Sequence, residues 1–338
     1  MKEPFTFLDP NNHYLEAIDL DWYKNLVKIE NIFNVATVNF YVARNIITMH
    51  LPVSTGSISS PMGRGSDSLP VRVNLNGVDT YLADSMQFML EYGCRLSDKG
   101  VYYLMPSFRG EKADERHLCE FYHSEVEIPG TLDDIMLLAE EYVRYLAKCI
   151  LQAYHEKIIH LDNISHIEKA AYNDQFFSRI SFDDAEKYLE ELVGKKEIHK
   201  YIEYCDGYRN ITRQGERELL KKYPDAVWIM NYDELAVPFY QKRTGDGKAK
   251  NADLLMGIGE TIGCGERHFS RNELLDALCY HEVNPEEYTW YIKLKEKFPL
   301  QTSGFGMGVE RFLMWVLNAT DIRNMQICLR FNGMSILP

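Results

Sequence analysis

Two long stretches of the chain carry apolar residues at the spacing of an amphipathic helix. Apolar side chains recur every three or four positions over residues 22–47, which contain neither proline nor glycine. This period predicts a long helix. Residues 131–158 predict a second one, whose charge runs from acidic at its start to basic at its end.

The segment after the first predicted helix lacks the helical spacing of apolar residues. "TMHLPV" predicts a short strand that Pro52 interrupts, and residues 54–70, "STGSISSPMGRGSDSLP", are rich in serine, glycine and proline. That composition predicts a long mobile loop. Loops of this length inside a compact domain are usually functional lids or disordered segments.

The remaining segments predict strands that pair locally. "VRVNLNGVDTYLA" predicts a hairpin with its turn at Asn76-Gly77, followed by a short helix in "SMQFMLEYGCRL". "GVYYLMPSFRGE" and "HLCEFYHSEVEI" predict strands on either side of a polar tip. Further strands are predicted in "AVWIMNY" and "ADLLMGIGETIG", a helix in "SRNELLDALCYHEV", and a strand entering a helix in "TSGFGMGVERFLMWVLNAT".

Because the predicted strands form hairpins and do not alternate with helices, we expect an α+β fold with an antiparallel β-sheet flanked by helices. Residues 160–225 are polar and predominantly helical in pattern. We therefore expect residues 1–338 to form a single domain with a helical insertion near 150–225.

The predicted hairpin around residues 108–121 concentrates charge on one face. Side chains two apart on a strand point the same way. Arg109 and Glu111 therefore share a face, as do Phe121, His123, Glu125 and Glu127 on the return strand. A solvated sheet surface has this appearance, but so does a nucleotide site, since arginine suits phosphate and an aromatic ring can stack on a base.

Two glycine-rich segments carry further candidate chemistry. Residues 252–268 place Asp253, Glu260, Glu266 and Arg267 beside four glycines. Glycine permits close approach to a ligand, and carboxylates can hold magnesium on a polyphosphate; a glycine-rich turn with exposed charges is the alternative. In "SGFGMGVER" (303–311), Arg311 lies in the first turn of a predicted helix, a suitable place for a phosphate clamp. No Gly-Lys-Ser/Thr sequence of a P-loop is present.

Composition narrows the class of protein. Hydrophobic residues make up 46% and charged residues 26% of the chain, as in an ordinary globular protein, and no apolar run approaches 18 residues. The N-terminus does not resemble a secretory signal. Seven scattered cysteines without a C-x-x-C pattern indicate a reducing cytoplasm. The net charge of −13 opposes general binding to nucleic acid.

Three segments in this order resemble the signature motifs of class II aminoacyl-tRNA synthetases, nearest to the asparaginyl/aspartyl subgroup. Residues 22–53 with Pro52 resemble motif 1, "FRGEKADERHLCEF" (108–121) resembles motif 2, and the glycine-rich run ending in Arg311 (304–311) resembles motif 3. "YLADSMQ", "PFYQKR" and "GIGETIGCGER" resemble subgroup segments, the last with Cys264 in place of a glycine. The resemblance covers residues 20–332.

The resemblance implies a role for each matching residue. ATP would be bound by Arg109 at the α-phosphate, by Glu111 and Phe121 at the adenine, and by Arg116, His117 and Arg311 at the β- and γ-phosphates. Mg2+ would be held by Glu260 and, less surely, Asp253, and the amino acid by Ser85, Gln87, Glu125 and Arg267. Arg109 and Arg311 would be the catalytic residues of adenylate formation. The motif 1 resemblance further implies a homodimer.

Three features depart from the resemblance. Motif 1 begins almost at the start of the sequence, so we expect no anticodon-binding barrel before it. Leu90 occupies the position where aspartyl enzymes have a lysine, and the loop between Arg109 and Arg116 is one residue shorter than usual. We therefore expect an AMP-forming, ATP-dependent ligase that activates aspartate or a related amino acid and passes it to ammonia or a small amine, as an asparagine synthetase does. The alternatives are a truncated asparaginyl/aspartyl-tRNA synthetase or tRNA-modifying paralogue, and a non-catalytic regulatory paralogue.

Overall fold

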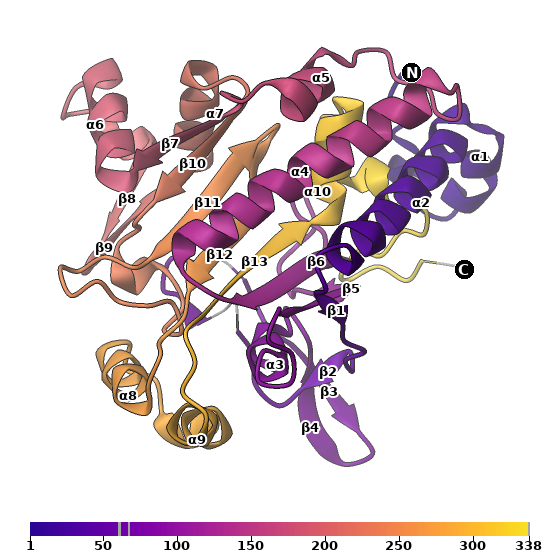
Figure 1. Ribbon diagram of the computed structural model, residues 1–338. Coiled ribbons are helices and arrows are strands. Elements are labelled where there is room, and N and C mark those ends of the chain that lie inside the picture. Colours follow the sequence, from indigo (N-terminus) through magenta and orange to yellow (C-terminus); the bar gives the residue numbers. More distant parts are fainter. Residues whose placement is uncertain (60–61, 67, 337–338) are drawn as a thin grey trace.

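A large mixed sheet forms the centre of the molecule (Figure 1). The computed structural model describes residues 1–59, 62–66 and 68–336, and within these ranges eight strands pair in the order β1-β5-β6-β13-β12-β11-β10-β7. The strands are β1 (Ile47–Thr48), β5 (Val101–Phe108), β6 (Glu120–Pro129), β7 (Phe177–Ser181), β10 (Ala226–Met230), β11 (Asn251–Met256), β12 (Gly259–Glu266) and β13 (Thr302–Gly308).

The six central strands are antiparallel, which confirms the expected α+β class. Only the two edge strands β1 and β7 pair in parallel with their neighbours. Two smaller sheets comprise β2 (Ser54–Thr55), β3 (Val71–Leu75) and β4 (Val78–Leu82), and β8 (Ile202–Cys205) and β9 (Tyr208–Ile211). The predicted β3–β4 hairpin turns at Asn76 and Gly77, both with positive φ (51° and 87°), and projects from the body of the molecule (Figure 1).

Helices pack on both faces of the main sheet. The α-helices are α1 (His13–Asp19), α2 (Asp21–Val42), α3 (Gln87–Gly93), α4 (Leu132–His155), α5 (Ser165–Tyr172), α6 (Phe182–Val193), α7 (Arg213–Lys222), α8 (Arg271–Tyr280), α9 (Thr289–Lys297) and α10 (Val309–Leu317). The long helix α4 runs across the sheet, with α2 alongside it (Figure 1). None of the described helices is long and apolar enough to span a membrane.

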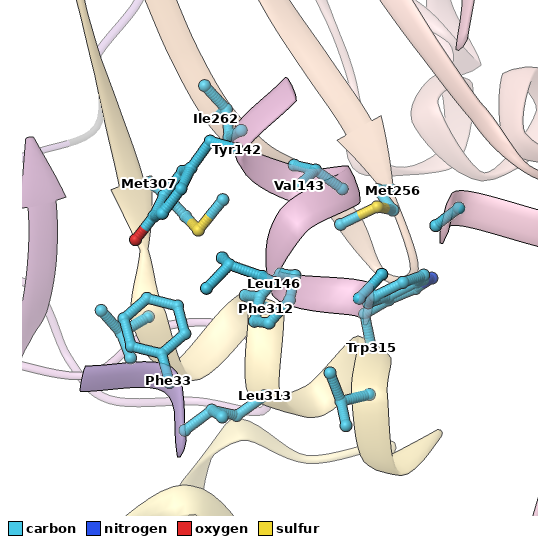
Figure 2. Packing of buried hydrophobic residues seen from close by; sticks show 14 of the residues in the cluster. Phe33, Tyr142, Val143, Leu146, Met256, Ile262, Met307, Phe312, Leu313 and Trp315 are labelled. Carbon is cyan, nitrogen blue, oxygen red and sulfur yellow. The ribbon is translucent and has the colours of Figure 1, made fainter. Parts of the chain in front are cut away.

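The main hydrophobic core lies between these helices and the sheet. Figure 2 shows Phe33 of α2, Tyr142 and Leu146 of α4 and Phe312 of α10 packed against side chains from the strands. Tyr142 also donates to or accepts from Ser124 of β6 at 3.0 Å, so it ties the helix layer to the strand that carries the charged face. Even-numbered residues of β6 thus point into the core, and odd-numbered ones point away. Tyr122 shares the even-numbered side but is 48% exposed, because it lies near the end of β6.

The predicted loop at 54–70 is docked onto the body of the molecule over its described residues. Arg64 and Gly65 donate backbone hydrogen bonds to the carbonyls of Leu235 and Ala236, in the 3-10 helix Glu234–Ala236. Asn210 of β9 donates to the carbonyl of Gly65 at 3.1 Å. Residues 60, 61 and 67 of the predicted loop lie outside the described residues.

The region expected as a helical insertion is mixed in structure. It contains the β8–β9 hairpin as well as α5, α6 and α7, and its strand β7 pairs with β10 at the edge of the main sheet. A separate small core joins this region to the sheet, and its buried members are Phe182, Ala185, Leu189, Ile198, Ile202, Leu219, Val227, Ile229 and Leu255. The hairpin was missed although the alternating Ile202-Glu203-Tyr204 and the Asp206-Gly207 turn are a hairpin signal in the sequence.

Candidate active site

The charged face of the β5–β6 pair looks away from the helices. Phe108 pairs with Glu120 and Tyr103 pairs with Glu125, so the two strands have the antiparallel register expected around the polar tip. Odd-numbered residues of β6 therefore share one face with Arg109, as the two-residue period predicts. The glycines of β12 and β13 at alternate positions keep this face open.

Two adjoining cavities lie over this face. The wider, of about 300 Å³, contains the expected amino-acid residues, and the narrower, of about 80 Å³, contains the expected ATP residues. The residues that line both are Arg109, His123, Glu260 and Gly306. A ligand that fills both cavities must pass these four residues, so the site can hold two joined groups.

The wider cavity contains a buried arginine with fixed orientation. Arg267 donates through Nε and Nη2 to the Glu127 carboxylate at 3.1–3.3 Å and through Nη1 to Gln241 Oε1 at 2.9 Å. The side chains of Arg267 and Glu127 are 3% and 0% exposed. Burial raises the pKa of Glu127 to about 7, while Arg267 opposes the rise. A methyl group at Gly304 would overlap the Glu127 carboxylate, so glycine is required for this close approach.

Ser85, Gln87 and Glu125, which the resemblance assigns to the amino acid, line the same cavity. Ser85 Oγ donates to Glu125 Oε2 at 2.7 Å and accepts from the Gln87 backbone N–H at 3.1 Å. Burial opposes ionisation of Glu125, but hydrogen bonds from His123, Tyr103 and Ser85 outweigh it and lower the pKa of this carboxyl. The cavity therefore presents an ionised acceptor beside a guanidinium donor.

A buried ion pair lies next to Leu90, in the wall of the wider cavity. Glu91, next to Leu90, accepts hydrogen bonds from Tyr291 Oη at 2.7 Å and from Lys295 Nζ at 2.6 Å. Both charged side chains of the pair are fully buried. Lys295 comes from α9, so the pair joins two helices that lie far apart in the sequence. Leu90 lines the cavity with an apolar side chain. Cys264 packs in the helix-side core and also lines the wider cavity.

The narrower cavity gathers three guanidinium groups. Arg109, Arg116 and Arg311 all line it. Burial lowers the pKa of Arg311, Glu260 opposes this, and the neighbouring charges of Arg109 and Arg116 lower it further. Buried nitrogens of Arg109 and Arg116 have no hydrogen-bond partner among the described residues. Unsatisfied cationic donors grouped in this way form a site for a polyanion.

Two of the expected phosphate ligands already have protein partners. Arg116 Nη2 donates to Glu216 Oε2 of α7 at 2.5 Å, and that glutamate is largely buried. His117 Nδ1 lies 3.0 Å from Asp114 Oδ1 and 3.0 Å from Arg213 Nη2. Helix α7 of the inserted region therefore contacts the motif 2 segment directly.

The expected adenine residues lie at the outer end of the narrower cavity. Phe121 lines it, and the Arg109 guanidinium lies over the Phe121 ring at 5.4 Å from the ring centre. Glu111 also lines this cavity and accepts from the Leu69 backbone N–H at 3.0 Å. The end of the 54–70 segment thus contacts the motif 2 segment, and Gly65, Ser66 and Ser68 of the same segment line the wider cavity.

Asp253 and Glu260 lie close together and suit a divalent cation. Burial and the charge of Glu260 raise the pKa of Asp253 well above its usual range. A methyl group at Gly263 would lie 3.0 Å from Glu260 Oε1 and 3.5 Å from Asp253 Oδ1, so glycine leaves room beside both carboxylates. No group of three metal-ligating side chains occurs among the described residues. Two carboxylates fit Mg2+ that arrives with phosphate ligands of its own.

Several site residues were not predicted. Gln241, the partner of Arg267, lies in "PFYQKR". This segment resembles one of the subgroup, but the resemblance assigned no role to Gln241. Glu127 was placed on the charged face without a partner. Glu216 lies in the ambiguous region 160–225, where no sequence pattern marks it. His123 was placed on the face, and the structure adds that it lies where the cavities meet.

Comparison with known proteins identifies the family. Residues 8–328 match the family "tRNA synthetases class II (D, K and N)". Asparagine–tRNA ligase of Malacoplasma penetrans is 29% identical over 313 residues, which cover 89% of this chain and 69% of that protein. Asparagine–tRNA ligase of Pyrococcus abyssi is 33% identical over 250 residues, which cover 72% of this chain but only 55% of that protein.

Solved structures show the same fold. Asparaginyl-tRNA synthetase from Pyrococcus horikoshii, complexed with asparaginyl-adenylate, superposes with a TM-score of 0.86 at 24% identity, over 99% of this chain and 74% of that chain. Aspartyl-tRNA synthetase from Entamoeba histolytica superposes with a TM-score of 0.76 at 17% identity, over 100% of this chain and 64% of that chain. The family match, which spans nearly the whole sequence, settles the classification: the chain belongs to the class II tRNA synthetases of the aspartate, lysine and asparagine group.

Proposed function

We propose that this protein uses ATP to activate asparagine as an aminoacyl adenylate and transfers the acyl group to a tRNA. The observation that carries the proposal is the pair of joined cavities, one lined by Arg267 and Glu125 and the other by three arginines. Their junction is where an amino-acid carboxylate and an α-phosphate would meet. The family is one of ATP-dependent ligases, which supports this reaction type.

The first step needs positioning more than proton transfer. The amino-acid carboxylate attacks the α-phosphorus, and pyrophosphate leaves with the bond electrons. Arg109, at the junction of the cavities, would neutralise the α-phosphate, and Arg311 the departing phosphates. Asp253 and Glu260 would hold Mg2+, which supplies charge neutralisation when bound. Such preorganised charge in a buried site is the usual source of rate acceleration for phosphoryl chemistry.

The charge of the amino-acid cavity favours a neutral carboxamide over a carboxylate. The Arg267 charge is balanced by Glu127, and Glu125 adds an ionised acceptor. Leu90 brings no cation where aspartyl enzymes have a lysine. A carboxamide supplies both an acceptor for Arg267 and a donor for Glu125, whereas an aspartate side chain would meet Glu125 as a like charge.

The comparisons support tRNA as the acyl acceptor better than ammonia, which the sequence alone had favoured. The relatives matched over most of this chain are named as asparagine–tRNA ligases. To test the acceptor, the protein is incubated with ATP, labelled asparagine or aspartate, and either total tRNA or ammonia. We expect label from asparagine in tRNA. Label appearing only in free asparagine from aspartate and ammonia would contradict the proposal.

Binding of Mg2+ should release protons. Burial and the charge of Glu260 raise the pKa of Asp253, so a cation that binds this carboxyl competes with a proton more strongly than it would at an ordinary aspartate. Apparent affinity for Mg2+ in the presence of ATP should therefore rise with pH. Calorimetric titration in two buffers of different ionisation enthalpy measures the proton release. Asp253→Asn should abolish the pH dependence, and an unchanged dependence in that variant would exclude this carboxyl as its source.

The exposed side of α2 supports the expected homodimer. Val27, Val35, Val38 and Val42 are 48–63% exposed and lie on one side of the helix. We expect light scattering to show a dimer, and Val35→Glu with Val38→Glu to give a monomer because two charges enter the interface. Val78→Glu, at the tip of the β3–β4 hairpin, serves as the control and should remain dimeric. A monomeric wild-type protein would contradict the dimer.

A further inference from the structure

His123 lies where the two cavities of the candidate site meet. It is one of the four residues that line both cavities, with Arg109, Glu260 and Gly306. The amino-acid carbonyl of an adenylate that filled both cavities would lie at this junction. His123 is the only imidazole among these four residues.

The imidazole is held in one orientation. Its Nδ1 lies 2.9 Å from Ser107 Oγ of β5 and 3.0 Å from Glu125 Oε1 of β6. The Phe121 ring packs edge-on against it with ring centres 4.8 Å apart. Within the described residues Nε2 forms no hydrogen bond, and the side chain keeps 12% of its surface exposed. Nε2 therefore has access to the cavity.

The partners of Nδ1 also select the tautomer. An ionised Glu125 can only accept, so the proton belongs on Nδ1 and the lone pair on Nε2. A carboxylate behind an imidazole is the arrangement that prepares a general base. The other charged groups that face this position are Arg109, which follows β5, and Glu260 of β12.

We propose that His123 is the general base of the acyl-transfer step. This inference rests on the proposed function. The acceptor hydroxyl of the tRNA loses its proton to Nε2 and attacks the adenylate carbonyl carbon. The carbonyl C–O bond to phosphate breaks, AMP leaves with the bond electrons, and the proton later returns to solvent from the imidazolium. Adenylate formation requires no such proton transfer, so the two steps should depend differently on His123.

The test compares His123→Gln with wild type in three reactions. These are asparagine-dependent ATP–pyrophosphate exchange, trapping of the adenylate by hydroxylamine, and single-turnover transfer from the preformed adenylate to tRNA. Hydroxylamine attacks without a base. We expect exchange and trapping to stay within about threefold, and transfer to fall about 10²-fold. The rise of the transfer rate with pH should disappear in this variant, and free imidazole should partly restore transfer in His123→Ala. His199→Gln, on the surface, should change none of the reactions.

Two results would overturn the inference. Equal losses in exchange and transfer would show that His123 only shapes the site, and unchanged transfer in His123→Gln would show that it is not the base. The absence of exchange in the wild-type protein would instead contradict the proposed function, so the two failures are distinguishable.

Discussion

Replacing Arg311 with alanine is expected to lower asparagine-dependent ATP–pyrophosphate exchange by about 10³-fold, the effect of removing an arginine that neutralises transferring phosphate. Arg311 lies at the start of α10 beside Arg109 and Arg116, and its Nη1 donates to the Glu260 carbonyl at 2.6 Å. This bond aims the guanidinium into the narrower cavity. Initial rates of exchange at saturating ATP and asparagine measure the loss.

Two further variants separate charge from geometry. Arg311→Lys keeps the charge but loses the planar fork of donors, so it should recover only part of the activity. Arg271→Ala removes an exposed arginine of α8, whose Nε lies 3.7 Å from Glu296 Oε1. This variant should catalyse exchange at the wild-type rate. Exchange by Arg311→Ala within about threefold of wild type would mean that this arginine does not contact the reacting phosphates.

Replacing Glu127 with glutamine is expected to change both stability and amino-acid choice. The substitution replaces the two-oxygen acceptor of the buried Arg267 guanidinium with a single amide oxygen, which should lower the free energy of unfolding. The same change makes the amino-acid cavity more positive. The preference for asparagine over aspartate in exchange should therefore fall by about tenfold, or ~1.4 kcal/mol. Measurements at pH 8, above the pKa of about 7 for Glu127, compare the variant with an ionised wild type.

The preference for asparagine over aspartate, measured at lower pH, provides an independent check of the Glu127 charge. As pH falls through the raised pKa of Glu127, the wild-type carboxyl takes up a proton, and its preference should approach that of Glu127→Gln. The variant should show a smaller pH dependence. Glu168→Gln, on the surface of α5, should alter neither stability nor preference. A Glu127→Gln protein with unchanged preference would show that this pair does not set the charge that the substrate meets.

The sequence predicted the charged face well because a strand repeats every two residues. Arg109 and Glu125 needed only this period and one hairpin to be placed together, and the register of β5 and β6 confirmed it. The Asn76-Gly77 turn could likewise be predicted from neighbouring residues alone. Glycines of β12 were recognised as positions that permit close approach to a ligand. The contact of Gly304 in β13 with Glu127 depends on sheet order, which no local pattern encodes.

Contacts between residues that are far apart in the sequence could not be predicted from local sequence patterns. Glu216 meets Arg116 from 100 positions away, and Lys295 meets Glu91 from 204 positions away. Composition predicted a mobile loop at 54–70, but its backbone is hydrogen-bonded to residues 235 and 236, which the sequence does not reveal. The sequence also weighed ammonia above tRNA from the net charge and the shortened loop, and comparison with relatives reversed that order.

Amino-acid activation is the central claim, and ATP–pyrophosphate exchange across the twenty amino acids tests it most directly. The joined cavities and their charges predict exchange that depends on Mg2+ and is fastest with asparagine, with aspartate at least about tenfold slower. Exchange with none of the amino acids, from a protein whose thermal unfolding is cooperative, would contradict the account.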